Sequence, residues 1–562
     1  MRWTIKPKPD AQSVDILQKA LQVDVSIAKL LVQRGIDTYE AAKTFFRPSI
    51  SDLHDPYLMK DMNIAVERIE TALDNNENIL VYGDYDVDGT TSVALMSSYL
   101  KTRSNRVATY IPDRYDEGYG ISYKGIDFAH DNDFTLIIAL DCGVKAIDKV
   151  AYASKKGIDF IICDHHRPAA SLPKAVAILD PKREDCKYPY KELCGCGVGF
   201  KLIQALAKNN GQTIEELGTY LDLVATAIGA DIVPITGENR ALAYFGLQVI
   251  NTNPRPGIKA IIDQVKKQEF TITDVVFIVA PRINAAGRMK HGNYAVSLLT
   301  ESDEDLAKTY AEEINSFNLD RREADQYITK EALDQIEKNN EENRLTTVVY
   351  DESWHKGVIG IVASRLTETY FRPTLVFTKS GEKLAASARS VPGFDVYNAL
   401  EACSEHIEQF GGHKYAAGLT LKEENYEAFK QAFEDEVSNT IDRNLLVPEI
   451  KIDSELNLSD ITPKFYRILK QFAPFGPGNM SPIFMTANLR DNGYGRCVGD
   501  DDKHLKLDLV QGACKISGIG FNLGDKLDLV KQNNYFSAVY SIDENHWQGQ
   551  VSLQLKLRDI KP

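Results

Sequence analysis

Five short apolar runs between residues 79 and 179 constrain the fold of this chain more than any other feature. Each run has the length of a buried strand, and polar stretches with helical spacing separate them. The runs are Ile79–Tyr82, Val107–Ile111, Leu136–Leu140, Phe160–Cys163 and Ala175–Leu179. Continuous apolar strands that alternate with helices indicate βαβ units, and therefore a parallel sheet covered by helices on both faces.

Acidic residues follow these runs directly, at Asp84, Asp141, Asp164 and Asp180. In open parallel sheets, ligands bind at the carboxyl ends of the strands. The four acid-bearing loops are therefore expected to converge at one edge of the sheet.

The chain has 562 residues, which predicts three or four domains. A mainly helical stretch follows from Val198 to about Leu299. An amphipathic helix with Ser302 as its expected N-cap then runs to about Ile336 as a connector between domains. A second α/β segment extends over residues 346–442, and the period-two pattern that follows predicts a small domain of antiparallel strands.

The charge balance argues against indiscriminate binding of nucleic acid. There are 65 Lys and Arg against 80 Asp and Glu, a net charge of −15, whereas affinity for nucleic acid comes largely from neutralised phosphates. The eight cysteines form no CxxC pair, and neither a signal peptide nor an apolar membrane span is visible. These features predict reduced thiols in a cytoplasmic protein without a membrane segment.

The string from Val81 to Ser92 contains Asp84, Asp86 and Asp88 at alternate positions. If the segment is extended, the three carboxylates share one face, where only bound cations would make their repulsion tolerable. The alternatives are a solvated acidic turn and a calcium loop. A calcium loop needs Glu at its twelfth position, which is Leu95 here, so a metal cluster is favoured.

A second string places His165 and His166 directly after a predicted strand, and Asp231 lies within an apolar run. A histidine pair can be a packing feature, and Asp231 can be a buried helix cap or an ion-pair partner. Several Asp with one or two His suit Mn²⁺ or Mg²⁺. Two such ions roughly 3.5–4 Å apart are the usual device for cleaving phosphate esters.

These strings resemble the motifs of the DHH phosphoesterase superfamily and, within it, the RecJ family of bacterial exonucleases that degrade single-stranded DNA from the 5′ end. The resemblance covers the chain from about residue 30 to its end. It rests on GDYDVDGTTS, ALDCG, CDHHR and GADIVP, and continues through IPDRYDEGYG, APRINAAGRM, HKGVIGIVASRL, SVPGFDVYNAL, FGGHKYAAG and FAPFGPGN.

The resemblance implies an α/β architecture: a parallel-sheet DHH domain, a long connecting helix, a second α/β DHH-associated domain and a C-terminal barrel similar to the oligonucleotide-binding (OB) fold. The expected limits are 1–50 for an N-terminal helical extension, 51–300 for the DHH catalytic domain, 301–342 for the connecting helix, 343–445 for the DHH-associated substrate-binding domain and 446–562 for the OB-like domain.

The same resemblance implies roles for individual residues. Two divalent ions, Mn²⁺ or Mg²⁺, would be held by Asp84, Asp86, Asp88, Asp141, His165 and Asp231. The residues expected in catalysis are Asp86, Asp88, Asp141, His165 and His166, the last as a contact to the scissile phosphate.

Substrate binding is assigned by resemblance to residues of the later motifs. They are Arg282, Asn284, Arg288, His355, Lys356, Ser387, Arg389, Gly411, Gly412 and His413. Stretches 281–299 and 411–422 carry basic residues and no acid, and we interpret them as loops that approach phosphates. The glycines that usually flank the serine in this family are Ala386 and Ala388 here.

The expected function is metal-dependent 5′→3′ degradation of single-stranded DNA to mononucleotides in recombination and repair, with a helicase and single-strand-binding protein as partners by analogy. One alternative is a DHH phosphodiesterase acting on short oligonucleotides or cyclic dinucleotides. Another is an inactive DNA-binding replication scaffold. The terminal β-domain argues against the first alternative, and the occupied ligand positions argue against the second.

Overall fold

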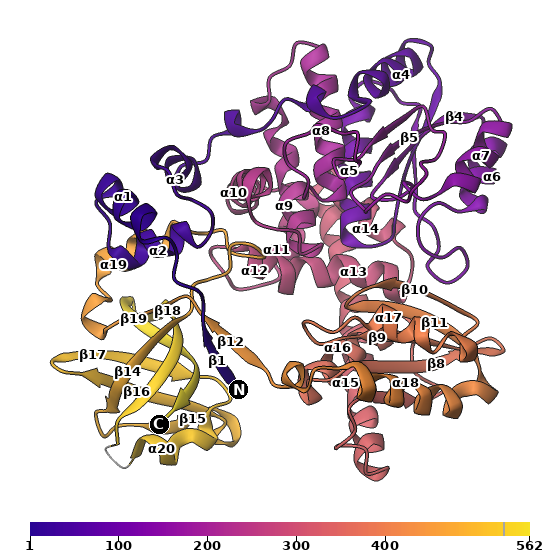
Figure 1. Cartoon of the computed structure of the whole chain (residues 1–562). Helices are drawn as coiled ribbons and strands as arrows, with labels where there is room; N and C mark the ends of the chain where they lie inside the picture. The colour runs from indigo at the N-terminus through magenta and orange to yellow at the C-terminus, as the bar shows by residue number, and fades with distance from the viewer. Residues whose placement is uncertain (532–533) are drawn as a thin grey trace.

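A five-stranded parallel sheet forms the centre of the first domain in the computed structural model, which describes residues 1–531 and 534–562 (Figure 1). Its strand order is β3-β2-β4-β5-β6. The strands are β2 (Asn78–Gly83), β3 (Val107–Tyr110), β4 (Phe134–Leu140), β5 (Asp159–Cys163) and β6 (Ala177–Leu179). The predicted parallel sheet is confirmed, and all five strands lie where the apolar runs placed them.

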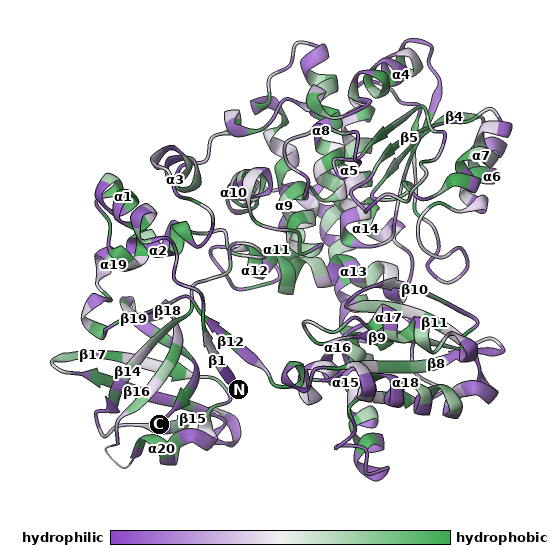
Figure 2. Cartoon of the chain, in the orientation of Figure 1, coloured by the Kyte–Doolittle hydropathy of each residue, from purple (hydrophilic) through white to green (hydrophobic). Residues whose placement is uncertain are grey.

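Helices cover both faces of this sheet, because alternate strand residues are buried on opposite sides. Ile79 and Val81 face a core shared with α4 (Met62–Asp74), α5 (Val87–Lys101) and α8 (Gly195–Asn209). Leu80 and Tyr82 face a second core with α6 (Tyr123–Asp131) and α7 (Ile147–Lys155). Figure 2 shows β4 and β5 as largely hydrophobic segments between these helices.

A helical layer follows the sheet, as the sequence predicts. It consists of α9 (Leu221–Ala230), α10 (Gly237–Thr252), α11 (Pro256–Ile262), α12 (Ile272–Asp274), a π-helical turn η4 (Val275–Val279), α13 (Ala280–Met289) and α14 (Asn293–Thr300). The interpretation of the basic stretch 281–299 as a loop is wrong, because α13 and α14 cover all of it except residues 290–292. The sequence APRINAAGRM is helix α13, in which Pro281 occupies the first turn, where its missing N–H is tolerated.

The connecting helix α15 (Glu304–Lys338) has 35 residues. Its N-cap is Asp303, whose side chain accepts hydrogen bonds from the amides of Asp305 and Leu306, so the expectation of Ser302 is wrong by one residue. The first half of α15 packs on the first domain through Ala311 and Ile314, and its second half packs on the second domain through Ile328 and Ala332.

The second α/β domain has a mixed five-stranded sheet of order β10-β11-β9-β8-β7. The strands are β7 (Thr347–Tyr350), β8 (Thr374–Ser380), β9 (Lys383–Arg389), β10 (Gln409–His413) and β11 (Ala416–Lys422). The helices are α16 (Ile359–Tyr370), α17 (Val396–Ala402) and α18 (Tyr426–Thr440). Only the β7–β8 pair is parallel, and the other pairings are antiparallel.

The C-terminal strands form a barrel. Strands β14, β18, β19, β17 and β16 pair in that order, and an additional β14–β16 pairing closes the ring. A five-stranded barrel is the arrangement of an OB fold. The elements are β13 (Ser454–Glu455), α19 (Pro463–Lys470), β14 (Phe484–Asp491), β15 (Arg496–Val498), β16 (His504–Gln511), β17 (Cys514–Gly520), α20 (Leu527–Lys531), β18 (Phe536–Trp547) and β19 (Gln550–Lys561).

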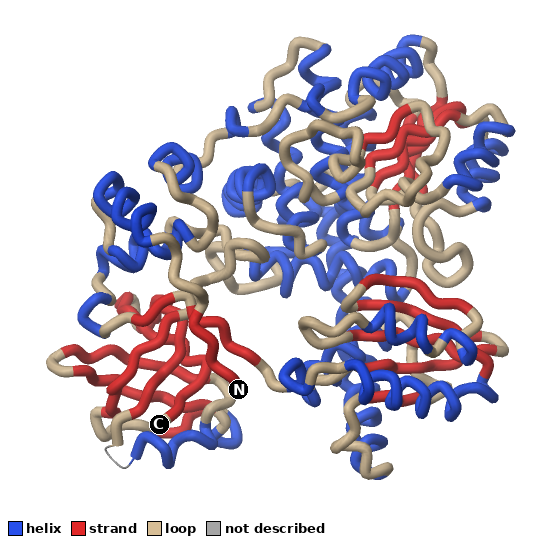
Figure 3. The backbone as a smooth tube through the Cα atoms, in the orientation of Figure 1, coloured by secondary structure: helices blue, strands red, loops and turns tan. Residues whose placement is uncertain are grey.

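The N-terminal segment packs with this barrel. Helices α1 (Ala11–Leu21), α2 (Val25–Val32) and α3 (Tyr39–Phe46) share a hydrophobic core with it. Strand β1 (Arg2–Ile5) pairs in parallel with β12 (Glu449–Ile452), which lies between the second domain and the barrel. Figure 3 shows the three strand-rich parts, with the parallel sheet above and the barrel and the mixed sheet side by side below it.

Candidate active site

The turn between β2 and α5 carries the first three acids. Asp84 follows the end of β2, and Asp86 is the N-cap of α5, with its Oδ1 accepting a hydrogen bond from the amide of Gly89 at 2.9 Å. Asp88 therefore lies in the first helical turn. We expected the three carboxylates to share one face of an extended segment. They do not, because the chain turns into a helix at Asp86.

The N-terminus of α8 holds Asp88. Its two carboxylate oxygens accept hydrogen bonds from the amides of Gly195 at 2.6 Å and Cys196 at 2.7 Å. The partial positive charge of a helix N-terminus stabilises a carboxylate there. A Cβ atom on Gly195 would lie 2.5 Å from Cβ of Asp141, so only glycine leaves room for Asp141 beside Asp88.

His165 lies among three carboxylates that come from different elements. Its Nε2 atom is 3.1 Å from Oδ1 of Asp141, 3.6 Å from Oδ2 of Asp231 and 3.7 Å from Oδ2 of Asp88. Asp141 follows β4, His165 follows β5, and Asp231 caps the end of α9. The ends of two strands and two helices thus bring together four of the predicted ligands.

Asp164 orients the histidine pair. Its buried carboxylate accepts hydrogen bonds from the amides of His165, His166 and Val144 and lies 2.8 Å from Nδ1 of His166. Burial opposes ionisation, but the hydrogen bond and the charge of His166 hold the pKa of Asp164 at about 2. In turn, burial would lower the pKa of His166, but Asp164 raises it to about 8. In the sequence Asp164 is recognisable as an acid at a strand end, but it was not among the predicted site residues.

We call Asp84, Asp86, Asp88, Asp141 and Asp231 the acid cluster, and its electrostatics favour the binding of cations. Burial and the neighbouring carboxylates raise the pKa of Asp84, Asp88 and Asp141 well above the usual value. Burial and the charge of Asp86 raise the pKa of Asp231 to about 7, although a third of its side chain is exposed. These acids resist ionisation together unless positive charge is supplied.

Unpartnered polar atoms fit the same conclusion. Among the described residues, Oδ2 of Asp84, Oδ1 of Asp141 and Nδ1 of His165 are buried without a hydrogen-bond partner. Asp88, His165 and Asp231 form one group with metal-ligand spacing, and Asp141, His165 and His166 form another. Burial and the charge of His166 lower the pKa of His165 to about 3, so its ring is neutral and able to coordinate. An oxygen-rich set with imidazole suits Mn²⁺ or Mg²⁺.

One further buried acid was not among the predicted site residues. Asp180 follows β6, is fully buried, and its Oδ2 has no hydrogen-bond partner within the described part of the chain. Burial raises its pKa to about 7, and the charge of Asp164 contributes. Its place at a strand end was visible in the sequence, but its burial was not.

Arginines gather beside the acid cluster. The guanidinium of Arg114 lies 3.9 Å from the ring centroid of Tyr85, the residue between Asp84 and Asp86. Its Nε donates to the carbonyl of Gly287 at 2.9 Å. Arg114 lies in the motif IPDRYDEGYG but was not among the predicted site residues. No sequence spacing relates Arg114 to Asp84 and Asp86, because only the fold brings it against Tyr85.

Arg288, a predicted substrate residue, lies near Arg114 and near Arg389, a second predicted substrate residue. Nη1 of Arg288 donates to the carbonyl of Gly357 at 3.0 Å, which links α13 to the second α/β domain. Burial and the charges of Arg114, Arg389 and Arg321 lower the pKa of Arg288 to about 10. We call these four residues the arginine group. Closely spaced guanidinium groups of this kind are suited to an anion.

Ser387 lies beside the arginine group at the N-terminal end of α16. A Cβ atom on Gly360 would be 3.1 Å from both Oγ of Ser387 and Nη2 of Arg389, so these two side chains converge there. Burial lowers the pKa of Arg389, and its Nη1 donates to the carbonyl of Ala388 at 2.7 Å.

Two further predicted substrate residues, His355 and His413, lie against residues of the first domain. The ring of His355 lies 6.3 Å from that of Tyr115. His413, at the end of β10, has its pKa lowered by burial and by the charges of Lys145 and His166, which places it near those two residues. A Cβ atom on Gly411 would meet open space, whereas one on Gly412 would lie 2.5 Å from the carbonyl oxygen of Ala416.

Three predicted substrate residues are less closely tied to the cluster. Arg282 and Asn284 lie on α13, where Nη1 of Arg282 donates to the carbonyl of Ile278 at 2.8 Å. The Nζ atom of Lys356 donates to Oγ of Ser380 at 3.0 Å, within the second domain.

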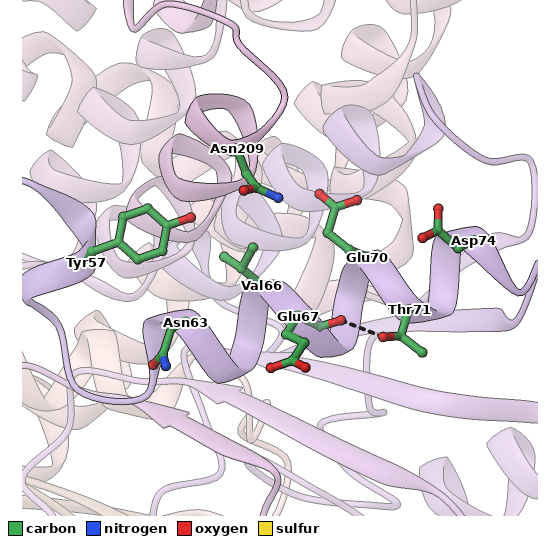
Figure 4. Close-up of a pocket in the computed structure, with 8 residues that line it drawn as sticks. All are labelled: Tyr57, Asn63, Val66, Glu67, Glu70, Thr71, Asp74 and Asn209. Carbon is green, nitrogen blue, oxygen red and sulfur yellow. Dashed lines mark hydrogen bonds between the residues drawn. The ribbon is translucent and has the colours of Figure 1, made fainter.

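A surface pocket of about 400 Å³ lies elsewhere (Figure 4). It is lined by α4 residues, Tyr57 and Asn209, the last residue of α8. The site described above is at the first residue of α8, and a helix of 15 residues is about 22 Å long. The pocket therefore has no part in this site.

Comparison with known proteins assigns the three domains. The RecJ OB domain matches residues 452–559, the N-terminal domain of the DHH family matches 78–228, and the DHHA1 domain matches 342–439. None of the described helices has the length and apolar character needed to cross a membrane.

Several relatives match along most or all of the chain. The single-stranded-DNA-specific exonuclease RecJ of Bacillus subtilis is 36% identical, over 100% of this chain and 70% of its own length. The protein of that name from Escherichia coli is 34% identical, over 89% of this chain and 90% of its own. A crystal structure of RecJ from Thermus thermophilus with Mn²⁺ superposes with a TM-score of 0.85 at 26% identity, covering 100% of this chain and 79% of that one. The chain belongs to the RecJ family of the DHH superfamily.

Proposed function

We propose that this chain is a metal-dependent exonuclease that degrades single-stranded DNA in the 5′→3′ direction to mononucleotides. The observation that carries the proposal is the contact between Arg114 and Tyr85, because it joins the arginine group to the acid cluster. A phosphate held by the arginines would place the adjoining phosphodiester at the acids. Relatives in this family are named single-stranded-DNA-specific exonucleases, and solved relatives contain Mn²⁺ or Mg²⁺.

The metal ligands in this proposal are Asp84, Asp86, Asp88, Asp141, His165 and Asp231. When bound, two divalent ions would supply Lewis-acid chemistry, activating water and offsetting the charge of the phosphate. The chain contributes the fixed geometry. The amides at the start of α8 hold Asp88, and Gly195 allows Asp141 to lie beside it.

His166 is the proposed contact to the scissile phosphate. Its pKa of about 8 keeps the imidazole protonated near neutral pH, so its free ring nitrogen can donate to a phosphate oxygen. Asp164 fixes the ring through Nδ1. The remaining catalytic assignments, to Asp86, Asp88, Asp141 and His165, coincide with proposed ligands.

The arginine group and Ser387 are proposed to bind the DNA end. Arg114, Arg288 and Arg389 have no ion pair with a carboxylate in the described ranges, so their charge is available for phosphate. A site for a terminal phosphate next to the hydrolytic centre would set the polarity of degradation. The other substrate contacts in the proposal are Arg282, Asn284, His355, Lys356, Gly411, Gly412 and His413.

The proposed division of labour follows the domain limits given above. Residues 51–300 would perform catalysis, 343–445 would hold substrate against the metal site, and the OB-like barrel would bind the strand further along. We place this activity in recombination and repair in the cytoplasm, alongside a helicase and single-strand-binding protein. The eight free cysteines, six of them buried, support a reducing compartment.

The test uses single- and double-stranded DNA labelled at the 5′ or the 3′ end, with RNA and dinucleotides as alternative substrates. Each is incubated with Mn²⁺, Mg²⁺ or chelator. We expect mononucleotides released from the 5′ end of single-stranded DNA only when metal is present. Rapid turnover of dinucleotides with slow turnover of long DNA would instead indicate a small-substrate phosphodiesterase.

A further inference from the structure

The loop that carries Asp231 has an unfavourable backbone conformation. Asp231 ends α9, and the next residue, Ile232, has a left-handed φ of 58° and a largely exposed side chain. A β-branched residue rarely adopts this conformation, and it persists only where the surrounding structure imposes it. The position of Asp231 therefore depends on what holds the residues that follow it.

Residues 476–478 of the C-terminal domain lie directly on this loop. The amide of Ile235 donates a hydrogen bond to the carbonyl of Pro477 at 2.7 Å. A Cβ atom on Gly476 would lie 2.5 Å from Cγ1 of Ile235, and one on Gly478 would lie 2.8 Å from Cγ2 of Thr236. The two segments are in contact closely enough to exclude any side chain at either glycine.

The catalytic domain holds the same loop from its own side. The hydroxyl of Tyr190 donates to the carbonyl of Pro234 at 3.2 Å, and Nδ2 of Asn239 donates to that carbonyl at 3.0 Å. Pro234 is thus fixed by the catalytic domain, and Ile235 by the C-terminal domain. Together they restrain the path of the chain from Asp231 onward.

Arg240 fixes the C-terminal segment to the catalytic domain. This buried side chain on α10 donates to the carbonyls of Phe45, Gln471, Phe472, Ala473 and Pro474, and pairs with no carboxylate among the described residues. Asn479 reinforces the turn, because its Nδ2 donates to the carbonyls of Phe472 and Pro474. Residues 471–479 are therefore held rigidly at the point where they meet the Asp231 loop.

We infer that residues 476–478 of the C-terminal domain restrain the loop that follows Asp231 and thereby position this proposed metal ligand. The inference rests on the proposed role of Asp231 as a ligand. Gly476 and Ile235 are positioning residues, since neither lies within the acid cluster. Asp231 lies 3.6 Å from His165, so a small displacement of its loop changes the ligand geometry.

The test is Gly476→Ala in the full-length protein, with Gly520→Ala as the matched control. Both add a methyl group within the C-terminal domain, 2.5 Å from Ile235 and 2.7 Å from Leu523 respectively, but only Gly476 adjoins the Asp231 loop. We measure Mn²⁺ affinity by calorimetry without DNA, kcat and KM on single-stranded DNA, and DNA binding in chelator. For G476A we expect about tenfold weaker Mn²⁺ binding and about tenfold lower kcat, as for supporting residues of metal ligands. KM and DNA binding in chelator should stay within twofold.

The double variant Gly476→Ala with Ile235→Ala makes room for the added methyl group and should restore part of both losses. Equal Mn²⁺ affinity and kcat in G476A and G520A would overturn the inference. If G476A does not fold, Ile235→Ala alone replaces it: weaker Mn²⁺ binding supports the inference, and unchanged binding overturns it.

Asp231→Asn separates this inference from the assignment on which it rests. If D231N binds Mn²⁺ and cleaves as the unmodified protein does, Asp231 is not a ligand and the proposed site itself is wrong. If D231N is inactive while G476A is normal, only the positioning role is wrong.

Discussion

Two groups of buried charge with opposite signs lie at the boundary between the two α/β domains. The acids belong to the first domain, whereas the arginine group draws Arg288 from α13 and Arg389 from β9. In the first domain, buried carboxylates repel one another, and their pKa values are raised. In the arginine group, burial lowers the pKa values of Arg288 and Arg389, and the neighbouring arginines lower that of Arg288 further. Arg114 partly offsets the rise in the pKa of Asp84, but among the described residues no ion pair joins the two groups. Each therefore needs its own counterion: a divalent cation for the acids, and a phosphate for the arginines.

Removing an acid tests the acid half of this comparison, and we expect it to cause the largest loss of activity. We expect Asp88→Asn to lower kcat by about 10³-fold or more, since groups that act as one unit lose most of their effect together. In chelator the variant should be at least as stable as the unmodified protein, because one repelling charge is gone. Thermal unfolding and single-turnover cleavage measure the two quantities.

The control for this variant is Glu67→Gln, which removes an exposed acid from the distant pocket. Cleavage by D88N at a rate close to that of E67Q would contradict the proposed metal centre.

Crowding the acids without changing their charge should have the next largest effect. In Gly195→Ala the added methyl group meets Cβ of Asp141, so Asp141 must move away from Asp88. We expect a loss in kcat of about 10²-fold with weaker Mn²⁺ binding. Gly218→Ala is the comparison, since a Cβ atom there meets nothing within 4 Å. If G195A matched G218A in Mn²⁺ affinity and kcat, the spacing of the two acids would be unimportant.

Removing an arginine should test the second half of the comparison and change binding more than turnover. For Arg389→Gln we expect KM for 5′-phosphorylated single-stranded DNA to rise about tenfold, because one charge-assisted contact is lost. Mn²⁺ affinity in the absence of DNA should not change. The same rise with a 5′-hydroxyl substrate would argue against a site for the terminal phosphate.

The smallest expected effect concerns stability and pH. The folded-state pKa of His166 lies above the ordinary value of 6.5, so the stabilisation from its pairing with Asp164 is fully present below about pH 6.5. It is lost as the pH rises through about 8. In chelator, the free energy of unfolding should therefore fall over this range, and the fall should be smaller in His166→Gln. Denaturant titrations at several pH values measure it, and parallel curves for the two proteins would show that the pair contributes nothing.

The sequence predicted the acid side of the boundary better than the basic side. Acids at strand ends converge because parallel strands all end at one edge, and that topology is legible in the apolar runs. Asp231 and the ends of β4 and β5 meet as expected. The prediction of an extended face for Asp84, Asp86 and Asp88 was wrong, because Asp86 caps a helix. The hydrogen bond that makes this cap could not be read from the spacing of the acids.

The arginine group depends on tertiary structure. Arg114, Arg288, Arg321 and Arg389 come from a loop after β3, two helices and a strand, and no sequence spacing relates them. The stretch around Arg288 was interpreted as a glycine-rich loop, although its glycine packs against Tyr85 from within helix α13. Burial also could not be read from the sequence, and it is burial that distinguishes Asp164 and Asp180 from surface acids.

The shared core of the N-terminal helices and the barrel has a consequence for biosynthesis. Leu17, Ile27 and Leu31 pack with barrel residues, and Nε1 of Trp3 donates to Asp559 at 2.8 Å, across 556 positions of the chain. During translation, helices α1–α3 emerge from the ribosome long before the barrel strands. Their apolar face therefore stays unpaired while the two α/β domains are synthesised. Contacts of such high sequence separation form slowly. A ribosome that stalls before the barrel is complete would release a chain with an exposed apolar N-terminus, which gives chaperones and proteases a means to recognise the unfinished protein.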